Sequence, residues 1–302
     1  MNLEARHCIL CGPASSKKVR YPATFSAEDL NVRIFSARRS PDRIHFRIVE
    51  CRDCGMVFSD PATDSSVLSE LYGRSELTYG SQEEQIYQSY VPVLNRGLLK
   101  ARSRNLFVEI GGGSGFLLKY GVENGFKSQI EIEPSAQAEE RFSPVLGGNS
   151  KFVRSVFGPS LLAESSASLV CFFQILDHVP NPVSFLRELY RALEPGGVAV
   201  CVTHDTKAFT AKILGERSPI FDIEHTYLFH RGNLKALFEK VGFGDVESFS
   251  VANRYALRYW AHLAPIPAVG KAFLLKTIEG LGLGDMQIRL HAGNFGLVAQ
   301  KT

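Results

Sequence analysis

From residue 105 onward, short apolar runs alternate with segments in which apolar residues recur at helical spacing. Buried strands are predicted for the runs LFVEI (106–110), QIEIE (129–133), SLVCFFQ (168–174), VAVCVT (198–203) and FGLVAQK (295–301). Helices are predicted over 115–124, 182–193 and 233–241, and Gly125 and Gly242 end the first and the last. This alternation predicts an α/β fold whose mostly parallel sheet is covered on both faces.

The first 104 residues follow a different pattern. Residues 1–60 contain short apolar runs, such as 44–49, and predict a small module built from short strands. Residues 61–104 have helical spacing and are interpreted as a helical linker or lid. Residues 105–302 then form the main domain. A second helical stretch, over 254–280, is expected to help to roof a substrate pocket.

Composition narrows the functional classes only slightly. The 302 residues are 45% hydrophobic and 22% charged, as in ordinary globular proteins, and the formal net charge is +3. Such a small excess is weak evidence for nucleic-acid binding. The basic residues between Arg33 and Arg47 form a local cluster, which we interpret as a solvated charged face rather than a phosphate-binding surface.

Apolar segments long enough to cross a bilayer, about 18 residues, do not occur, and the first residues contain no apolar signal-peptide core. We therefore expect a cytoplasmic protein without a membrane span. In a reducing compartment the six cysteines are not expected to form disulfides. Cys171 and Cys201 lie inside apolar runs and are expected to be core residues.

The other four cysteines form two Cys-x-x-Cys pairs, CILCG and CRDCG, each followed by glycine. Two intervening residues let both thiolates of a pair reach one ion, and glycine permits the positive φ of the tight turn. A redox dithiol would explain one pair but not two matched ones. The sequence therefore predicts a closed, structural Zn²⁺ site formed by Cys8, Cys11, Cys51 and Cys54.

A glycine loop, EIGGGSG (109–115), connects a predicted strand to a predicted helix. Its spacing differs from the dinucleotide-binding pattern, because Phe116 occupies the position of the last glycine. Glu133, at the end of the next strand, is suited to accept hydrogen bonds from the hydroxyl groups of a ribose. The alternative is a tight turn beside a solvated carboxylate.

These motifs resemble, in the correct order, those of class I S-adenosylmethionine-dependent methyltransferases. The matching segments are EIGGGSG, IEIEPS, QILDHVPNPVSFLRELYRALEPGG, EHTYLFHRGNLKALFEKVGF and AGNFGLVAQK. The resemblance implies a Rossmann-like, seven-stranded sheet with an antiparallel last strand. The segment VECRDCGMVFSDP resembles the zinc-binding N-terminus of a subgroup that includes deoxysugar C-methyltransferases and polysaccharide-cluster methyltransferases.

The resemblance also assigns roles in binding S-adenosylmethionine. The loop from Gly111 to Gly115 passes under the methionine part of the cofactor, and Glu109 orients that loop or meets the cofactor ammonium through water. Glu133 holds the ribose, and Gln174 faces the methionine end. The adenine contact maps near 155–157, where the acidic residue common in the family is missing, so it stays open. The full expected set is Glu109, Gly111, Gly112, Gly113, Gly115, Glu133 and Gln174.

Several side chains on the loops after the later strands are candidate bases for deprotonating a methyl acceptor. Ligands of open α/β sheets lie beyond the carboxyl ends of the strands, and histidine titrates near neutrality. His178 has the alternative role of bracing its own loop. The candidates are Asp177, His178, His204, His225 and Tyr227.

Three functional hypotheses follow. The first is a methyltransferase acting on a small molecule or glycan, with a sugar or nucleotide-linked sugar as the leading acceptor. The second is an RNA methyltransferase whose zinc ribbon binds the nucleic acid, which the near-neutral charge disfavours. The third is a non-catalytic binding module, which the intact glycine loop and Glu133 disfavour.

Overall fold

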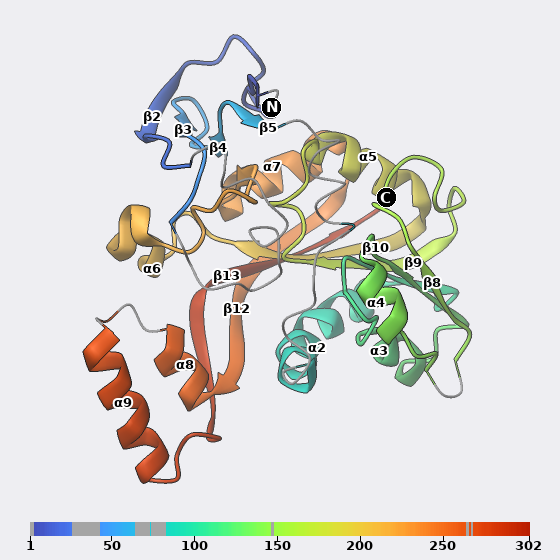
Figure 1. Cartoon of the computed structure of the whole chain (residues 1–302). Helices are drawn as coiled ribbons and strands as arrows, with labels where there is room; N and C mark the ends of the chain where they lie inside the picture. Colours follow the sequence, from blue (N-terminus) through green and yellow to red (C-terminus); the bar gives the residue numbers. More distant parts are fainter. Residues whose placement is uncertain are drawn as a thin grey trace.

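A computed structural model describes residues 3–25, 43–63, 73, 83–145, 148–263, 266 and 268–302 (Figure 1). Most of the basic cluster predicted between Arg33 and Arg47 lies outside these residues, as do 64–72 and 74–82 of the predicted helical linker.

The centre of the molecule is a seven-stranded sheet with the strand order β12-β13-β10-β9-β6-β7-β8. Strand β13 is antiparallel to both of its neighbours, and β10, β9, β6, β7 and β8 are mutually parallel. The predicted α/β sheet with an antiparallel last strand is confirmed. Its strands are β6 (Leu106–Ile110), β7 (Ser128–Ile132), β8 (Ser150–Val153), β9 (Ala167–Phe173), β10 (Leu193–His204), β12 (Gly244–Ala256) and β13 (Gln287–Gln300).

Both faces of this sheet are buried, so the central strands are apolar throughout. In β10, Val198 and Val200 pack on one face, while Ala199 and Cys201 pack on the other. Helices α5 (Pro182–Ala192) and α7 (Arg231–Val241) cover one face, and α2 (Glu83–Lys100), α3 (Leu118–Glu123) and α4 (Ala136–Arg141) lie on the other (Figure 1). Both cysteines expected in the core, Cys171 and Cys201, are fully buried.

Local sequence explains where these helices begin and end. Asn181 caps α5 by accepting a hydrogen bond from the Ser184 backbone, and Pro182 occupies the first turn. His230 caps α7, and Gly242 ends it with φ of 118°. Gly97 lets α2 approach the sheet closely, since a β-carbon there would overlap Val200.

The cysteine-containing module lies beside the central sheet and has a sheet of its own, to which the later part of the chain contributes one strand. Its four-stranded sheet has the order β11-β4-β3-β2, formed by β2 (Lys17–Tyr21), β3 (Ile48–Cys51), β4 (Val57–Ser59) and β11 (Tyr227–Leu228). Strand β11 comes from the loop before α7, far along the chain. A second pair, β1 (Leu3–Glu4) and β5 (Ala62–Thr63), completes the module, so its strands extend past the predicted boundary at residue 60.

Two strands of the central sheet were not predicted from periodicity. Strand β8 is short and β12 lies at the sheet edge, where most side chains are only half-buried and a register shift follows Val251. Both therefore lack a clear apolar pattern. The predicted helical region 254–280 is corrected accordingly, because β12 continues to Ala256.

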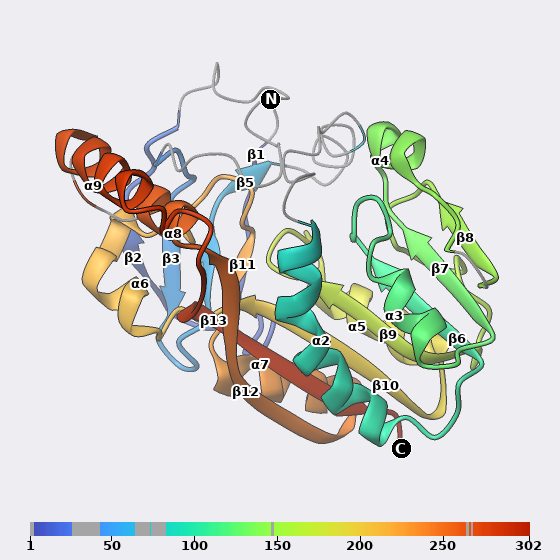
Figure 2. The same ribbon diagram turned by 90° about the horizontal axis from the view of Figure 1, so that it is seen from below.

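Beyond the sheet, β12 and β13 continue as a paired arm that carries α8 (Leu257–Leu263) and α9 (Ala268–Gly280) (Figures 1 and 2). Helix α9 packs mainly on α8. A further short helix, α6 (Phe209–Leu214), and a 3₁₀ turn, η3 (Gly215–Arg217), follow β10. Across the described helices, no segment has the length and apolar character needed to traverse a bilayer.

Candidate functional site

The glycine loop leaves β6 at the carboxyl edge of the sheet. Gly111, Gly113 and Gly115 have φ of 72°, 69° and 77°, which side chains with a β-carbon rarely adopt. A β-carbon at Gly112 would overlap the carboxyl group of Glu109. Glycine is therefore required at all four predicted positions, either by backbone angle or by space.

Three carboxyl groups accept hydrogen bonds from the backbone of this loop and of the residues that follow it. The backbone N–H of Gly112 donates to Glu131 Oε1 at 2.8 Å, and that of Gly113 donates to Glu133 Oε2 at 3.3 Å. The N–H of Leu117 donates to Glu109 Oε2 at 3.2 Å. Glu133 also accepts from Ser135 at 3.0 Å. The structure thus brings Glu133 to the glycine loop, beside which the sequence predicted it to act.

Glu131 was not foreseen. It is fully buried and faces Glu109 across the neighbouring parallel strands β6 and β7. Burial raises the pKa of Glu109 to about 8, and burial together with the Glu109 charge raises that of Glu131 well above its usual value. Burial therefore favours the protonated form of both carboxyls. The only sequence signal was a polar residue at a buried strand position.

Gln174 follows β9 in a strained backbone conformation, with φ of 59°. Its backbone N–H donates to the Val202 carbonyl at 2.7 Å, which fixes the turn. The side-chain oxygen, Oε1, is buried without a hydrogen-bond partner among the described residues. An orphaned acceptor of this kind suits the ammonium group of a bound amino acid, such as the methionine end of S-adenosylmethionine.

Four of the five candidate bases form one cluster beyond β9 and β10. Asp177 is fully buried, and its Oδ2 lies 2.6 Å from His204 Nδ1 and 3.8 Å from His225 Nε2. The ring centroid of His225 lies 4.7 Å from that of His178 and 5.1 Å from that of His204. Burial alone would raise the pKa of Asp177, but the His204 hydrogen bond and the surrounding histidines hold it well below its usual value.

Hydrogen bonding sets the orientation of two of these rings. His225 Nδ1 lies 2.7 Å from the Ile220 carbonyl, which only accepts, so this nitrogen is assigned the proton and Nε2 faces Asp177. His204 Nδ1 donates to the Asp177 carboxylate, which leaves Nε2 as its acceptor atom. The His204 side chain is 24% exposed, compared with 9% for His225. His204 is therefore the histidine of this pair more accessible to a substrate.

Tyr227 is not brought into this cluster. Its hydroxyl donates to the His7 carbonyl at 3.2 Å, and its ring stacks on Phe58 of the cysteine module. Burial raises its pKa. The side chain thus packs β11 against β4 and the His7 segment within the module.

The four paired cysteines meet at one point, with all sulfur atoms within 4.8 Å of one another. The turn glycines Gly12 and Gly55 have φ of 86° and 71°, as the motif requires. Burial opposes ionisation of Cys51, but backbone N–H groups of Cys54 and Asp53 lower its pKa to about 7. Four converging thiols supported by N–H donors fit a tetrahedral Zn²⁺ ion. Asp177, His178 and His225 also have ligand atoms within 4.8 Å of one another.

Hydrogen bonds connect the cysteine module directly to the histidine cluster. Ser59, on β4, donates through its hydroxyl to the His225 carbonyl at 2.9 Å and through its N–H to the Thr226 carbonyl at 3.0 Å. Thr226 in turn donates its N–H to the Asp177 carbonyl at 2.7 Å. The module therefore supports the backbone of two cluster residues.

Comparison with known proteins identifies the family of the central domain. The family described as "Methyltransferase domain" matches residues 82–248, more than half of the chain. A tRNA U34 carboxymethyltransferase of Helicobacter acinonychis is 26% identical over 153 residues, which cover 48% of this chain and 58% of that protein. An uncharacterized methyltransferase of Mycobacterium sp. is 30% identical over 94 residues, covering 31% and 36%. The chain thus spans less than two thirds of either relative.

Solved structures share the fold at low sequence identity. A chain of the Haloferax volcanii complex containing the Trm112 methyltransferase activator superposes with a TM-score of 0.53 and 15% identity, covering 74% of this chain and 92% of that one. The YcgJ protein of Bacillus subtilis gives 0.51 and 12%, covering 71% and 98%.

Proposed function

This chain belongs to the S-adenosylmethionine-dependent methyltransferase-domain family, and from that premise we propose that it methylates a small-molecule or glycan acceptor. The acceptor we favour is a hydroxyl-bearing molecule, such as a sugar or a nucleotide-linked sugar. The observation that carries this proposal is the 2.6 Å hydrogen bond between Asp177 and His204, which has the geometry of a general base held by a carboxylate.

When bound, S-adenosylmethionine supplies a methyl group that its sulfonium makes electrophilic. Gly111–Gly115 and Glu133 would hold the cofactor at the carboxyl edge of the sheet, and Gln174 Oε1 would accept from its ammonium group. A cofactor held in this way would lie beside the loop that carries Asp177, three residues after Gln174.

His204 Nε2 would accept the proton of the acceptor hydroxyl as the acceptor oxygen forms its bond to the methyl carbon and the methyl–sulfur bond breaks. Asp177 orients the ring through Nδ1 and stabilises the imidazolium that results. His225, anchored to the Ile220 carbonyl, and His178 would complete the wall around the acceptor.

The zinc ion held by Cys8, Cys11, Cys51 and Cys54 would act structurally, since four thiolates leave no position for a substrate. Its role would be to fix β3 and β4, and through Ser59 the segment that carries His225.

A second candidate is methylation of RNA, which the similarity to the tRNA U34 carboxymethyltransferase supports. The two functions differ in the acceptor and leave the cofactor site unchanged. A third, a non-catalytic binding module, predicts cofactor binding without turnover.

The test is release of S-adenosylhomocysteine by the zinc-loaded protein over a panel of sugars, nucleotide-linked sugars, glycans and total tRNA. We expect turnover with a small-molecule or glycan acceptor, and a decrease of about 10²- to 10⁴-fold in His204→Gln with unchanged cofactor affinity. Turnover with tRNA alone would establish the second candidate. Cofactor binding without turnover on any acceptor would favour the third. Unchanged activity after dialysis against a chelator too weak to remove the four-cysteine zinc would exclude a metal role for Asp177, His178 and His225.

A further inference from the structure

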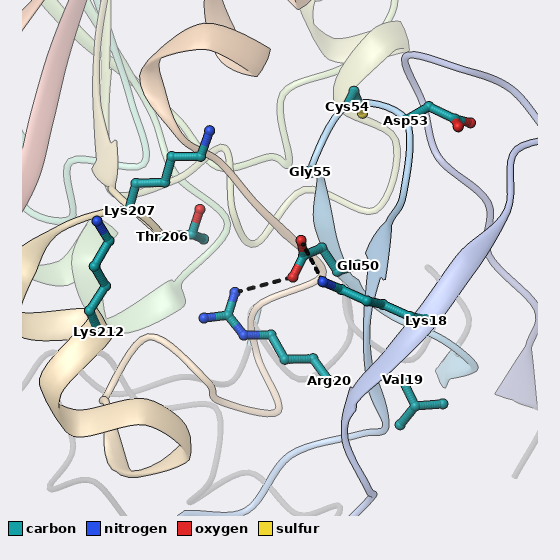
Figure 3. Close-up of a pocket in the computed structure, with 10 residues that line it drawn as sticks. All are labelled: Lys18, Val19, Arg20, Glu50, Asp53, Cys54, Gly55, Thr206, Lys207 and Lys212. Carbon is teal, nitrogen blue, oxygen red and sulfur yellow. Dashed lines mark ion pairs between the residues drawn. The ribbon is translucent and has the colours of Figure 1, made fainter.

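A hollow of about 740 Å³ lies between the cysteine module and the loop after β10 (Figure 3). One wall is formed by the module, with Lys18 and Arg20 on β2 and Glu50 on β3. The other wall is formed by Thr206 and Lys207 and by Lys212 on α6. A hollow of this size is typical of sites for small molecules.

Among the described residues, two of its cationic side chains have no carboxylate within ion-pair distance. Lys18 Nζ lies 3.2 Å from Glu50 Oε1, and Arg20 NH1 lies 3.9 Å from Glu50 Oε2, so both share one carboxylate. Lys207 and Lys212 make no ion pair with any described residue. Among the side chains that line the hollow, four are cationic and two are anionic. The hollow therefore attracts a small, multiply charged anion.

Backbone hydrogen bonds fix the position of the segment that carries Lys207. Asp205 donates its N–H to the Gly293 carbonyl at 2.8 Å, and Thr206 donates to the Phe229 carbonyl at 2.8 Å. Lys207 N–H donates to Asp205 Oδ1 at 2.8 Å. Because the backbone is fixed, binding an anion orders only the lysine side chains.

The hollow is connected to the proposed base along the chain. Thr206 follows His204 by two residues, at the end of β10. Gly55, directly after the cysteine Cys54, lines the opposite side with φ of 71°. Because two residues span at most about 7 Å, an anionic group bound at Thr206 would leave the rest of the same molecule within reach of His204.

We propose that this hollow binds the phosphate or diphosphate group of the methyl acceptor, an inference that rests on the proposed function. Within the described residues the charge of this site is confined to one hollow, which favours a small phosphorylated molecule over RNA, whose binding draws on contacts to many backbone phosphates. A chain with a formal net charge of +3 and two uncompensated lysines in one hollow fits the smaller ligand.

The test is calorimetric titration of the zinc-loaded, full-length protein with inorganic pyrophosphate at 50 and 300 mM NaCl. We expect saturable binding that weakens with salt and falls at least about tenfold in the double variant Lys207→Ala/Lys212→Ala. The charge-matched control Lys119→Ala/Lys235→Ala removes two exposed lysines of α3 and α7 and should change the affinity less than twofold.

Separate titrations with S-adenosylmethionine and with single-stranded RNA complete the experiment. If all variants bind the cofactor equally and the wild type does not bind pyrophosphate, the phosphate site is overturned and the proposed function stands. If the wild-type protein does not bind the cofactor, the proposed function is overturned instead. The phosphate site would also be overturned if RNA bound more tightly than pyrophosphate and if both double variants weakened RNA binding equally.

Discussion

The buried pair Glu109 and Glu131 ties the glycine loop to the protonation state of the site. Glu131 accepts the N–H of Gly112, and Glu109 accepts that of Leu117. Burial raises the pKa of both carboxyls, so the folded protein favours their protonated forms. A raised pKa in the folded state means that the pair favours folding at low pH and opposes it as pH rises towards 8.

Glu131→Gln should therefore flatten the pH dependence of stability. Relative to wild type, we expect the free energy of unfolding of the variant to increase between pH 5.5 and 8.5, by at most about 1.4 kcal/mol per pH unit. Glutamine keeps the acceptor for Gly112 and removes the charge. Urea unfolding at several pH values measures the difference, and Glu140→Gln, on the exposed end of α4, is the control. Parallel curves for wild type and Glu131→Gln would contradict the raised pKa of Glu131.

At the same scale, sequence indicates local features better than long-range contacts. The glycine loop and Glu133 could be proposed from sequence because their motif is local. Asp177, His204 and His225 lie on three different loops that converge in the fold. The sequence shows only that loops following strands lie at the same edge of the sheet, not which of their side chains meet. Glu131 was missed because a carboxyl group in a buried strand contradicts the expected pattern, and only its neighbour Glu109 explains it.

Among the elements, α2 shows how a single position sets helix packing. Gly97 lies where the helix meets the sheet, against Val200 and Leu169. Glycine normally weakens a helix relative to alanine by about 1 kcal/mol, so close packing must outweigh propensity here. Gly270, in α9, has open space around its α-carbon.

The same substitution should therefore have opposite effects in the two helices. We expect Gly97→Ala to destabilise the protein by about 1–3 kcal/mol through overpacking. Gly270→Ala should stabilise it, or the local helix, by up to about 1 kcal/mol. Thermal and urea unfolding of both variants measure this. Stabilisation by Gly97→Ala would show that α2 does not pack on the sheet as described.

Strands that are buried on both faces were easier to predict from sequence than strands at the sheet edge. The central strands β6, β9 and β10 were predicted because both faces are covered and the runs are apolar. The edge strand β12 was not, since its side chains are mostly half-buried and its pairing shifts register. Strand β11, two residues long, forms only because β4 of a distant segment pairs with it.

For the whole molecule, hydrogen bonds connect the cysteine module to the methyltransferase domain at the histidine cluster. Ser59 holds the His225 and Thr226 carbonyls, and His230 Nε2 lies 3.3 Å from the Cys54 carbonyl. The glycine loop and Glu133 lie on other strands, β6 and β7. Loss of zinc should thus affect the acceptor side more than cofactor binding.

Zinc removal provides the corresponding prediction. In Cys11→Ala, or after strong chelation, we expect a lower melting temperature and at least about tenfold lower methyl transfer, with cofactor affinity within about threefold. Metal analysis, calorimetry and the release assay measure the three quantities. Cys201→Ala removes a buried thiol outside the cluster and should retain one zinc per chain. Full transfer by zinc-free protein would refute the coupling.

The central claim, a functional S-adenosylmethionine site at the glycine loop, is tested most directly by calorimetric titration of the zinc-loaded protein with S-adenosylmethionine and S-adenosylhomocysteine. We predict micromolar binding of both, weakened at least about tenfold by Glu133→Ala and unchanged by the exposed Glu140→Ala. Absence of binding by folded, zinc-loaded wild-type protein, or equal binding by Glu133→Ala, would contradict it.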